Sequence, residues 1–171
     1  RKESSAASDV YKRQRVLLAA CAPIGQQDDA GSDALFDACR SGHAPVVRLL
    51  LARGADARGT AVGRTSALMH ACREGYVEVV ELLLARGCAA DEVDDDGWNA
   101  LHYAASGGQL SCAALLLHRR AHVDALDARG DSALVVAKLR AHAACARLLV
   151  EHGAVDLSLI HISEPTRLGM I

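Results

Sequence analysis

The amino-acid sequence predicts an all-α solenoid, a stack of helix–turn–helix units joined by short β-hairpin-like loops. The main observation is a repeat with a period of 33 residues, whose copies place Asp33, Ser66, Asn99 and Ser132 at one equivalent position. Leucine follows two residues later in every copy, and a run of apolar residues such as Leu115–Leu117 follows in the second half. Helices this short bury their apolar faces only against neighbours of the same shape, so a fixed period predicts a stack.

The period divides the chain into units. We expect repeats at residues 31–60, 61–93, 94–126 and 127–156, preceded at residues 15–30 by the remnant of another repeat. In each repeat a turn precedes a short first helix, a second turn precedes a longer helix, and an exit loop leads onward. We expect the leucine-rich second helices to form the interior that neighbouring repeats share.

The repeat at residues 94–126 shows the local signals most clearly. Asp96 and Gly97 are typical of a turn, and Asn99 is a good N-cap for a helix over residues 100–106. Residues 109–118 are apolar on more than one side, which predicts a second helix buried between neighbours.

Short motifs within the repeats resemble those of a known family. The segment from Gly97 to Ala105 reads Gly-Trp-Asn-Ala-Leu-His-Tyr-Ala-Ala, and Gly-His, Gly-Ala-Asp and Gly-Ala motifs begin at Gly42, Gly54 and Gly153. Together with the leucine-rich helices, they resemble the ankyrin-repeat pattern of Gly-x-Thr-Pro-Leu-His-x-Ala-Ala, Gly-His, a Leu-Leu helix and Gly-Ala-Asp. The resemblance covers residues 15–156 and implies stacked helix pairs whose hairpin tips and first helices bind protein partners.

Several positions depart from the family pattern. Alanine replaces the turn proline in all four motifs, at Ala34, Ala67, Ala100 and Ala133. The motif histidine is kept only at His102, and glycine is replaced by Arg64 (with Gly63 one residue early), Arg120 and Ala141, while Lys138 replaces an alanine. If the backbone of Arg120 is left-handed, we expect a cost of roughly 1–2 kcal/mol. These departures lower the expected stability of individual repeats and leave the resemblance intact.

The two ends of the chain differ from the repeats. Codons for Asp9–Gln14 can be written so that their reverse complement encodes Leu157–Ile162, which places one DNA element at both ends in opposite orientation. This element resembles the transposase end sequence used in preparing sequencing libraries. We expect residues 1–14 and 157–171 to be adapter-like, non-native tails, and the array to continue in both directions. A genomic read that encodes either tail contiguously with the repeats would contradict this expectation.

Charge, hydropathy and cysteine usage narrow the classes of function. The chain carries 19 Lys and Arg against 21 Asp and Glu, which argues against nucleic acid or an anionic membrane as a partner. No apolar run reaches the roughly 18 residues that a membrane helix needs. The six cysteines form no C-x-x-C pair, and equivalent cysteines in adjacent repeats should lie about 10 Å apart, too far for a disulfide. Buried, reduced thiols predict an intracellular protein, cytoplasmic or nuclear.

No catalytic signature is present. The sequence lacks a phosphate loop, a G-x-S-x-G motif and an H-E-x-x-H motif, so we expect neither catalytic residues nor a cofactor. His102 can be read as a base or a metal ligand, but in the family its position is structural and ties the turn to the helix. His142 and Cys145 lie three apart on one predicted helix, but structural zinc usually needs four ligands, so we expect no metal.

The surface of the hairpin tips and first helices remains as the candidate site. By resemblance to the family, the expected partner-binding residues are Arg40, Thr65, Arg73, Glu74, Asp95, Asp96, Trp98, Arg129, Asp131 and Arg140. Other variable positions on this surface are Ser32, Ser41, Ser106, Gly107, Ala128 and Leu139.

Two features of this surface stand out. The acidic loop at residues 91–96 is either a solvated hairpin whose aspartates cap the turn, or a docking site for a basic segment. Trp98, the only tryptophan, either contacts a partner as a binding hot spot or packs on the neighbouring hairpin stem. Together they predict a protein partner with a basic segment, in which Lys or Arg flanks an apolar residue.

Two classes of function fit such an array. The first is a non-enzymatic scaffold or adaptor for protein–protein interaction. The alternative is the substrate-targeting region of a larger enzyme, such as a ubiquitin ligase, kinase or acyltransferase, and the full coding sequence would distinguish the two. Self-association is a third hypothesis, which would appear in light scattering as a mass that depends on concentration.

Overall fold

The computed structural model describes residues 33–58 and 62–155, and these residues form helix pairs. The pairs are α2 (Ala34–Arg40) with α3 (Ala44–Ala52), α4 (Ala67–Glu74) with α5 (Val77–Ala85), α6 (Ala100–Gly107) with α7 (Leu110–His118), and α8 (Ala133–Leu139) with α9 (Ala143–Glu151). A short 3₁₀ turn, η1 (Val62–Arg64), precedes α4. An isolated antiparallel bridge joins Leu126 and Ser132, and no β-strand is assigned within the described ranges, so the predicted all-α class is confirmed. The predicted tails, the 15–30 remnant and Ser32 lie outside these residues.

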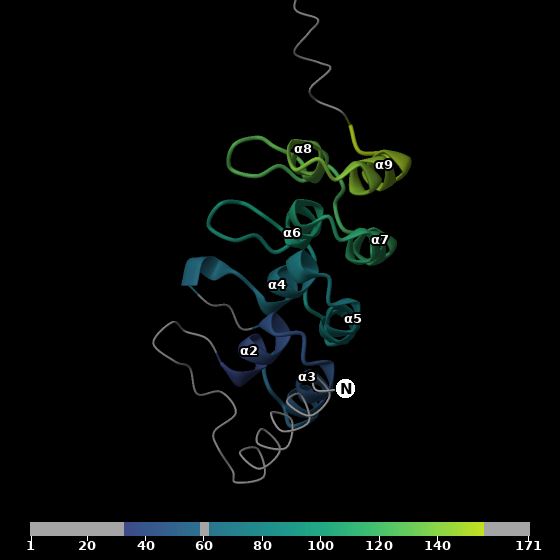
Figure 1. Ribbon diagram of the computed structural model, residues 1–171. Coiled ribbons are helices and arrows are strands. Elements are labelled where there is room, and N and C mark those ends of the chain that lie inside the picture. The colour runs from purple at the N-terminus through teal and green to yellow at the C-terminus, as the bar shows by residue number, and fades with distance from the viewer. Residues whose placement is uncertain (1–32, 59–61, 156–171) are drawn as a thin grey trace, which may run out of the picture.

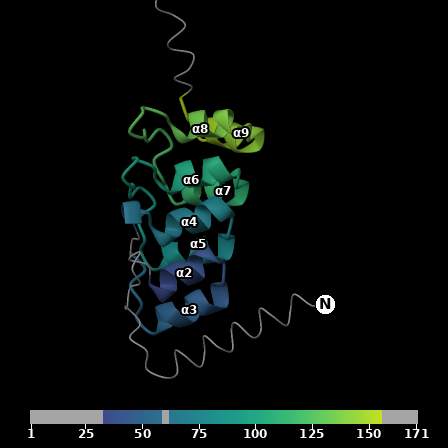
Figure 2. The ribbon, with the colours of Figure 1, turned by 60° about the vertical axis from the view of Figure 1, so that its left-hand side comes forward.

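The pairs stack in register into two layers (Figure 1). The first helices α2, α4, α6 and α8 contact one another in sequence and form one layer, and the second helices α3, α5, α7 and α9 form the other. The loops between pairs project from the first-helix side, at the left of Figure 1, and the turned view in Figure 2 shows that they project together from one side. Each repeat therefore contacts chiefly its neighbours, as in a solenoid.

The first helix of each pair begins after an N-cap residue at the same position of the repeat. The side chain of Asn99 accepts hydrogen bonds from two backbone N–H groups of α6, each at 3.1 Å. Asp33 and Ser66 cap α2 and α4 in the same way. Ser132 breaks the series, because its hydroxyl forms no cap bond and is buried without a hydrogen-bond partner.

We predict that Ser132→Asn raises the free energy of unfolding by about 1 kcal/mol, because asparagine supplies the missing N-cap acceptor. The equivalent Asn99 is 1% exposed, so the position accommodates this side chain in the neighbouring repeat. Urea denaturation followed by circular dichroism measures the change. Ser132→Ala is the control and should be nearly neutral, since the hydroxyl makes no hydrogen bond. A decrease of about 1 kcal/mol in its free energy of unfolding, as for the loss of an N-cap, would contradict the prediction.

Turns at three equivalent positions of the repeat have left-handed backbone. After the second helices, φ is +82° at Gly87 and +64° at Arg120, in equivalent positions. Arg64 and Ala141, which also replace glycine, have φ of +56° and +60°. The condition stated for Arg120 is therefore met, and each of these three residues carries the steric strain of its Cβ atom.

Arg120→Gly should stabilise the array by about 0.5–1 kcal/mol, which is the relieved left-handed strain less the extra backbone entropy that glycine loses on folding. Thermal and urea denaturation measure the gain. Gly87→Ala is the converse control and should destabilise the array, because alanine is strained at a φ of +82°. A Cβ atom there meets no atom closer than 3.7 Å, so a steric clash does not contribute. Equal stability of Arg120→Gly and the parent chain would show that this strain is negligible.

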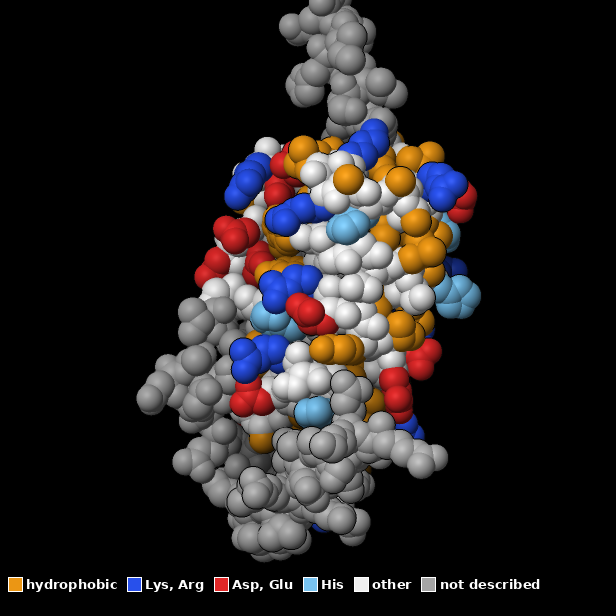
Figure 3. Space-filling model, in the orientation of Figure 1, with side chains coloured by type: hydrophobic (Ala, Val, Ile, Leu, Met, Phe, Trp, Pro, Cys, Tyr) orange, Lys and Arg blue, Asp and Glu red, His pale blue; other side chains and the backbone are white. Residues whose placement is uncertain are grey.

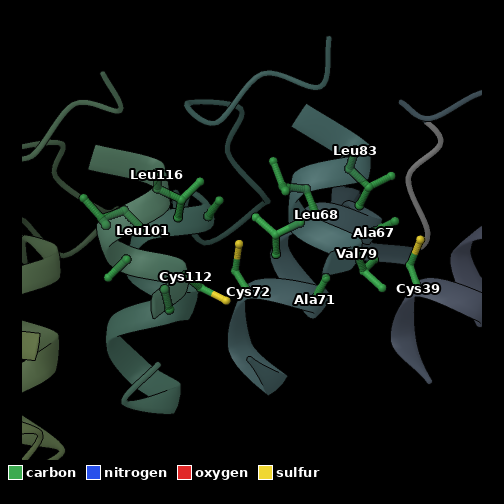
Figure 4. Packing of buried hydrophobic residues seen from close by; sticks show 14 of the residues in the cluster. Cys39, Ala67, Leu68, Ala71, Cys72, Val79, Leu83, Leu101, Cys112 and Leu116 are labelled. Carbon is green, nitrogen blue, oxygen red and sulfur yellow. The ribbon is translucent and has the colours of Figure 1, made fainter. Parts of the chain in front are cut away.

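The core lies between the layers and between the repeats (Figure 4). The first-helix leucines Leu68 and Leu101 and the second-helix leucines Leu83 and Leu116 are each at most 1% exposed. They alternate along the stack, so each repeat completes the core of the next, as the period predicts. No helix within the described ranges is both long enough and apolar enough to cross a membrane.

The cysteines act as small core residues. Cys39, Cys72, Cys112 and Cys145 are buried free thiols, and burial raises the pKa of Cys39 to about 12 and that of Cys112 to about 11. The sequence analysis compared cysteines at equivalent positions of adjacent repeats. In the structure, Cys72 on α4 and Cys112 on α7, which are not equivalent, lie beside each other (Figure 4). Thiols with raised pKa values are poor nucleophiles, so these side chains serve packing.

Candidate functional site

The hairpin at residues 94–98 is organised around one buried carboxylate. Asp94 is 7% exposed, and its Oδ1 accepts hydrogen bonds from the backbone N–H groups of Asp96 at 3.0 Å and Trp98 at 2.8 Å. Its Oδ2 accepts a hydrogen bond from the Tyr103 hydroxyl at 2.7 Å, which ties the turn to α6. The interaction with Asp94 helps to raise the pKa of Tyr103 to about 12, after burial as the larger cause. Asp94 is therefore part of the architecture of the hairpin.

Asp127 has the same role one repeat later. Its Oδ1 accepts from the backbone N–H groups of Arg129 at 2.8 Å and Asp131 at 2.9 Å, and its Oδ2 accepts from the indole Nε1–H of Trp98 at 2.9 Å. Burial acts to raise the pKa of Asp127, but the hydrogen bonds from Asp131, Arg129 and Trp98 outweigh it and leave the pKa below its usual value. This carboxylate thus joins two consecutive hairpins.

Backbone hydrogen bonds also connect the hairpin tips. The N–H of Asp95 donates to the carbonyl of Gly63 at 3.1 Å, and the N–H of Ala128 donates to the carbonyl of Asp96 at 3.0 Å. Gly97 permits this approach, because its φ is +79° and a Cβ there would lie 2.8 Å from the Ala128 nitrogen. The side chains of Asp95 and Asp96 remain exposed. The tips therefore present carboxylates from a rigid, connected edge.

Trp98 packs against its own repeat and the next one. It is partly buried, its ring stacks on His102 with centroids 6.1 Å apart, and it meets the edge of Tyr103 at 5.5 Å. Its N–H is committed to Asp127. In the free protein, Trp98 thus packs on the neighbouring hairpin, as one of the two interpretations expected, and part of the indole stays exposed. Contact between that exposed part and a partner stays a prediction.

His102 connects the first helix to two turns. It is 0% exposed, the Asn99 backbone N–H lies 3.3 Å from its Nδ1, and its Nε2 lies 3.2 Å from the Asp131 carbonyl oxygen. Nδ1 also lies 2.7 Å from the side-chain oxygen of Asn99, so the ring connects the N-cap of α6 to the next hairpin. Burial lowers the pKa of His102, so the ring is neutral at pH 7. The structural role expected for this column agrees with these contacts.

The exposed side of the first helices carries positive charge and aromatic rings. Arg40 on α2 and Arg73 on α4 are exposed, and they pair with Asp37 at 3.5 Å and Glu74 at 3.0 Å. His70 lies partly buried between them on this side. In Figure 3, basic side chains follow the first-helix face and acidic side chains gather over the hairpins at the left.

The predicted partner-binding residues fall into two groups. The exposed ones are Arg40, Arg73, Glu74, Asp95, Asp96, Arg129 and Arg140, and the partly buried ones are Thr65, Trp98 and Asp131. Of the other variable positions, Ser41, Ala128 and Leu139 are exposed, and Ser106 and Gly107 are partly buried. The structure therefore distributes them over the hairpins and the first-helix face.

The sequence-based prediction did not single out His70, Asp94 or Asp127 individually. The available signal for His70 was a ring at nearly the same position in three consecutive first helices, with Phe36 before it and Tyr103 after it. For the two aspartates, the signal was their spacing of one repeat period at the start of each turn. Among the described residues, no group of three His, Cys, Asp or Glu side chains is arranged to hold a metal ion.

Comparison with known proteins agrees with the repeat architecture. Two overlapping segments, residues 6–91 and 68–160, match the family described as ankyrin repeats (three copies). None of the curated proteins compared with the chain matches it. The family matches span every helix described above and reach into both predicted tails, whose origin stays a prediction. The chain belongs to the ankyrin-repeat family.

Proposed function

We propose that this chain is a protein-binding module that holds an extended segment of a partner across the hairpin tips and the exposed side of the first helices. Ankyrin repeats are in general protein–protein interaction modules and are typically non-catalytic. The observation that carries the proposal is the hydrogen-bonded edge of hairpins, which holds the exposed carboxylates of Asp95 and Asp96 in place. A rigid edge loses little conformational entropy when a partner binds.

The chemistry of this edge favours a basic segment. Asp95 and Asp96 project beside the partly exposed indole of Trp98, so Lys or Arg side chains can meet the carboxylates while an apolar residue contacts the ring. The proposal concerns the array itself. It applies equally to an adaptor and to the targeting region of a larger enzyme, because the binding surface does the same work in both.

Binding of fluorescein-labelled peptides with a basic–apolar–basic core tests the proposal by fluorescence anisotropy. We expect Asp95→Ala/Asp96→Ala to weaken binding about threefold to tenfold, as two partly solvated charge pairs are lost. Trp98→Phe keeps an aromatic ring and removes the indole N–H. It therefore separates the contribution of aromatic contact from that of the hydrogen bond to Asp127.

The matched control is Glu81→Ala/Glu151→Ala, which removes two exposed carboxylates from the second-helix layer on α5 and α9. It changes the net charge equally and should leave binding unaltered. If the two double variants weaken binding equally, the attraction is a general charge effect and the hairpin site is wrong.

A further inference from the structure

We propose that the first-helix face takes an aspartate or glutamate side chain of the same partner segment, in a site formed by His70 with Arg40 and Arg73. This inference rests on the proposed function and adds the chemistry of a second contact. The partner segment would then carry its acidic side chain over α2 and α4 and its basic side chains over the hairpin edge.

The first argument comes from the imidazole of His70. Its Nδ1 is buried and has no hydrogen-bond partner, a condition shared within the described ranges only by the Ser132 hydroxyl. The ring is held by Phe36, edge-on at 5.2 Å, and by Tyr103, at 6.3 Å, rather than by polar contacts. The fold therefore positions this imidazole without using its hydrogen-bonding capacity.

The second argument concerns the proton of that ring. A buried N–H without an acceptor is rarer in proteins than a buried acceptor without a donor, so the proton belongs on Nε2 rather than on the buried Nδ1. Burial, followed by the charges of Arg73 and Arg40, lowers the pKa of His70, while Glu74 acts weakly in the opposite direction. A neutral imidazole with Nε2–H offers one hydrogen-bond donor between two cations.

The third argument comes from the arginines. Arg40 and Arg73 occupy equivalent positions on neighbouring first helices, and their side chains are 61% and 47% exposed. Their ion pairs with Asp37 and Glu74 are similarly exposed and contribute little to stability, so each guanidinium can turn toward a new acceptor at small cost. Because two arginines face two carboxylates of the same chain, the local charge sums to about zero.

The pattern is confined to these two helices. The positions equivalent to Arg40 and Arg73 in the later repeats are Ser106 and Leu139, and neither carries charge. The Arg40–His70–Arg73 site therefore belongs to α2 and α4, whereas the Asp95–Asp96 tip belongs to the loop that precedes α6. A partner segment of mixed charge fits both, and a uniformly basic segment does not.

Paired peptides test the inference. Each pair shares the basic–apolar–basic core and differs only by Glu or Gln in the flank that reaches the first helices. We expect the Glu peptide to bind the parent chain about threefold to tenfold more tightly. Arg40→Gln/Arg73→Gln should abolish this difference without weakening the Gln peptide, and Arg48→Gln/Arg147→Gln, on the second helices, should preserve it.

A second readout follows His70 itself. NMR titration of its imidazole protons should show a higher pKa in the complex with the Glu peptide than with the Gln peptide, because a nearby carboxylate stabilises the imidazolium. Equal affinities and equal His70 pKa values for the two peptides would overturn the inference, even if Asp95→Ala/Asp96→Ala still weakens binding. If no peptide binds, or if the hairpin variants have no effect, the proposed function fails, and the inference fails with it.

Discussion

Leu116→Ala lowers the free energy of unfolding by about 2–5 kcal/mol. Leu116 is 0% exposed in the second half of α7, and it lies in the interior near Leu101 of α6 (Figure 4). Truncation removes methyl groups from a packed interface and leaves a cavity, which the repeats on either side can close only by shifting against each other. Urea denaturation monitored by circular dichroism measures the loss.

The matched control is Leu110→Ala on the same helix. Leu110 is 44% exposed, so its truncation removes fewer contacts and should cost less than half as much as Leu116→Ala. Hydrogen exchange adds a spatial test, because stability in a repeat array is approximately a sum of repeat and interface terms. Protection should fall most in α6 and α7. Equal costs for the two leucines would show that the interior of this repeat is loosely packed.

Asp94→Ala lowers the free energy of unfolding by about 2–3 kcal/mol, because three donors lose a charged acceptor. They are the backbone N–H groups of Asp96 and Trp98 and the hydroxyl of Tyr103. The hydroxyl and the two turn N–H groups must then find water at a partly buried position. Thermal and urea denaturation report the change, and a peptide-binding assay reports whether the hairpin edge keeps its shape.

Three variants separate the contributions at Asp94. Asp95→Ala, in the same loop but exposed, should stay within about 0.5 kcal/mol of the parent chain. Asp94→Asn retains acceptor oxygen and should cost less than alanine. Tyr103→Phe combined with Asp94→Ala completes a double-mutant cycle, whose coupling energy measures the hydroxyl–carboxylate bond. A coupling energy near zero would mean that Asp94 acts only on the turn.

The helices of this protein could be predicted closely because their signals are local and repeat. The expected first helix at residues 100–106 and second helix at 109–118 agree within one residue with α6 and α7. Arg120 occupies a position that carries glycine in the other repeats, which raised the possibility of a left-handed backbone, and its φ is +64°. Comparison of equivalent positions in the repeats does not reveal contacts between residues at non-equivalent positions. The neighbouring thiols Cys72 and Cys112 come from different columns, so comparison of equivalent cysteines did not reveal them.

The candidate surface was predicted as a region, but the roles of its residues were not. Five of the six residues at 91–96 are acidic, yet Asp94 is buried and Asp95 and Asp96 are exposed. Trp98 stood between two interpretations because its hydrogen-bond acceptor, Asp127, lies 29 residues away in the next hairpin. His70 was passed over because the rings that hold it belong to two neighbouring repeats.

The sequence by itself determined the repeat period, the helix pairs, the buried leucine columns and the ankyrin-repeat family, because each of these depends on residue spacing within one unit and its recurrence. Only the tertiary structure decided which polar side chains build the hairpins and which are left to a partner. That decision depends on contacts between units. A carboxylate that accepts three hydrogen bonds from its surroundings is committed to the fold, whereas an exposed carboxylate keeps its capacity to bind.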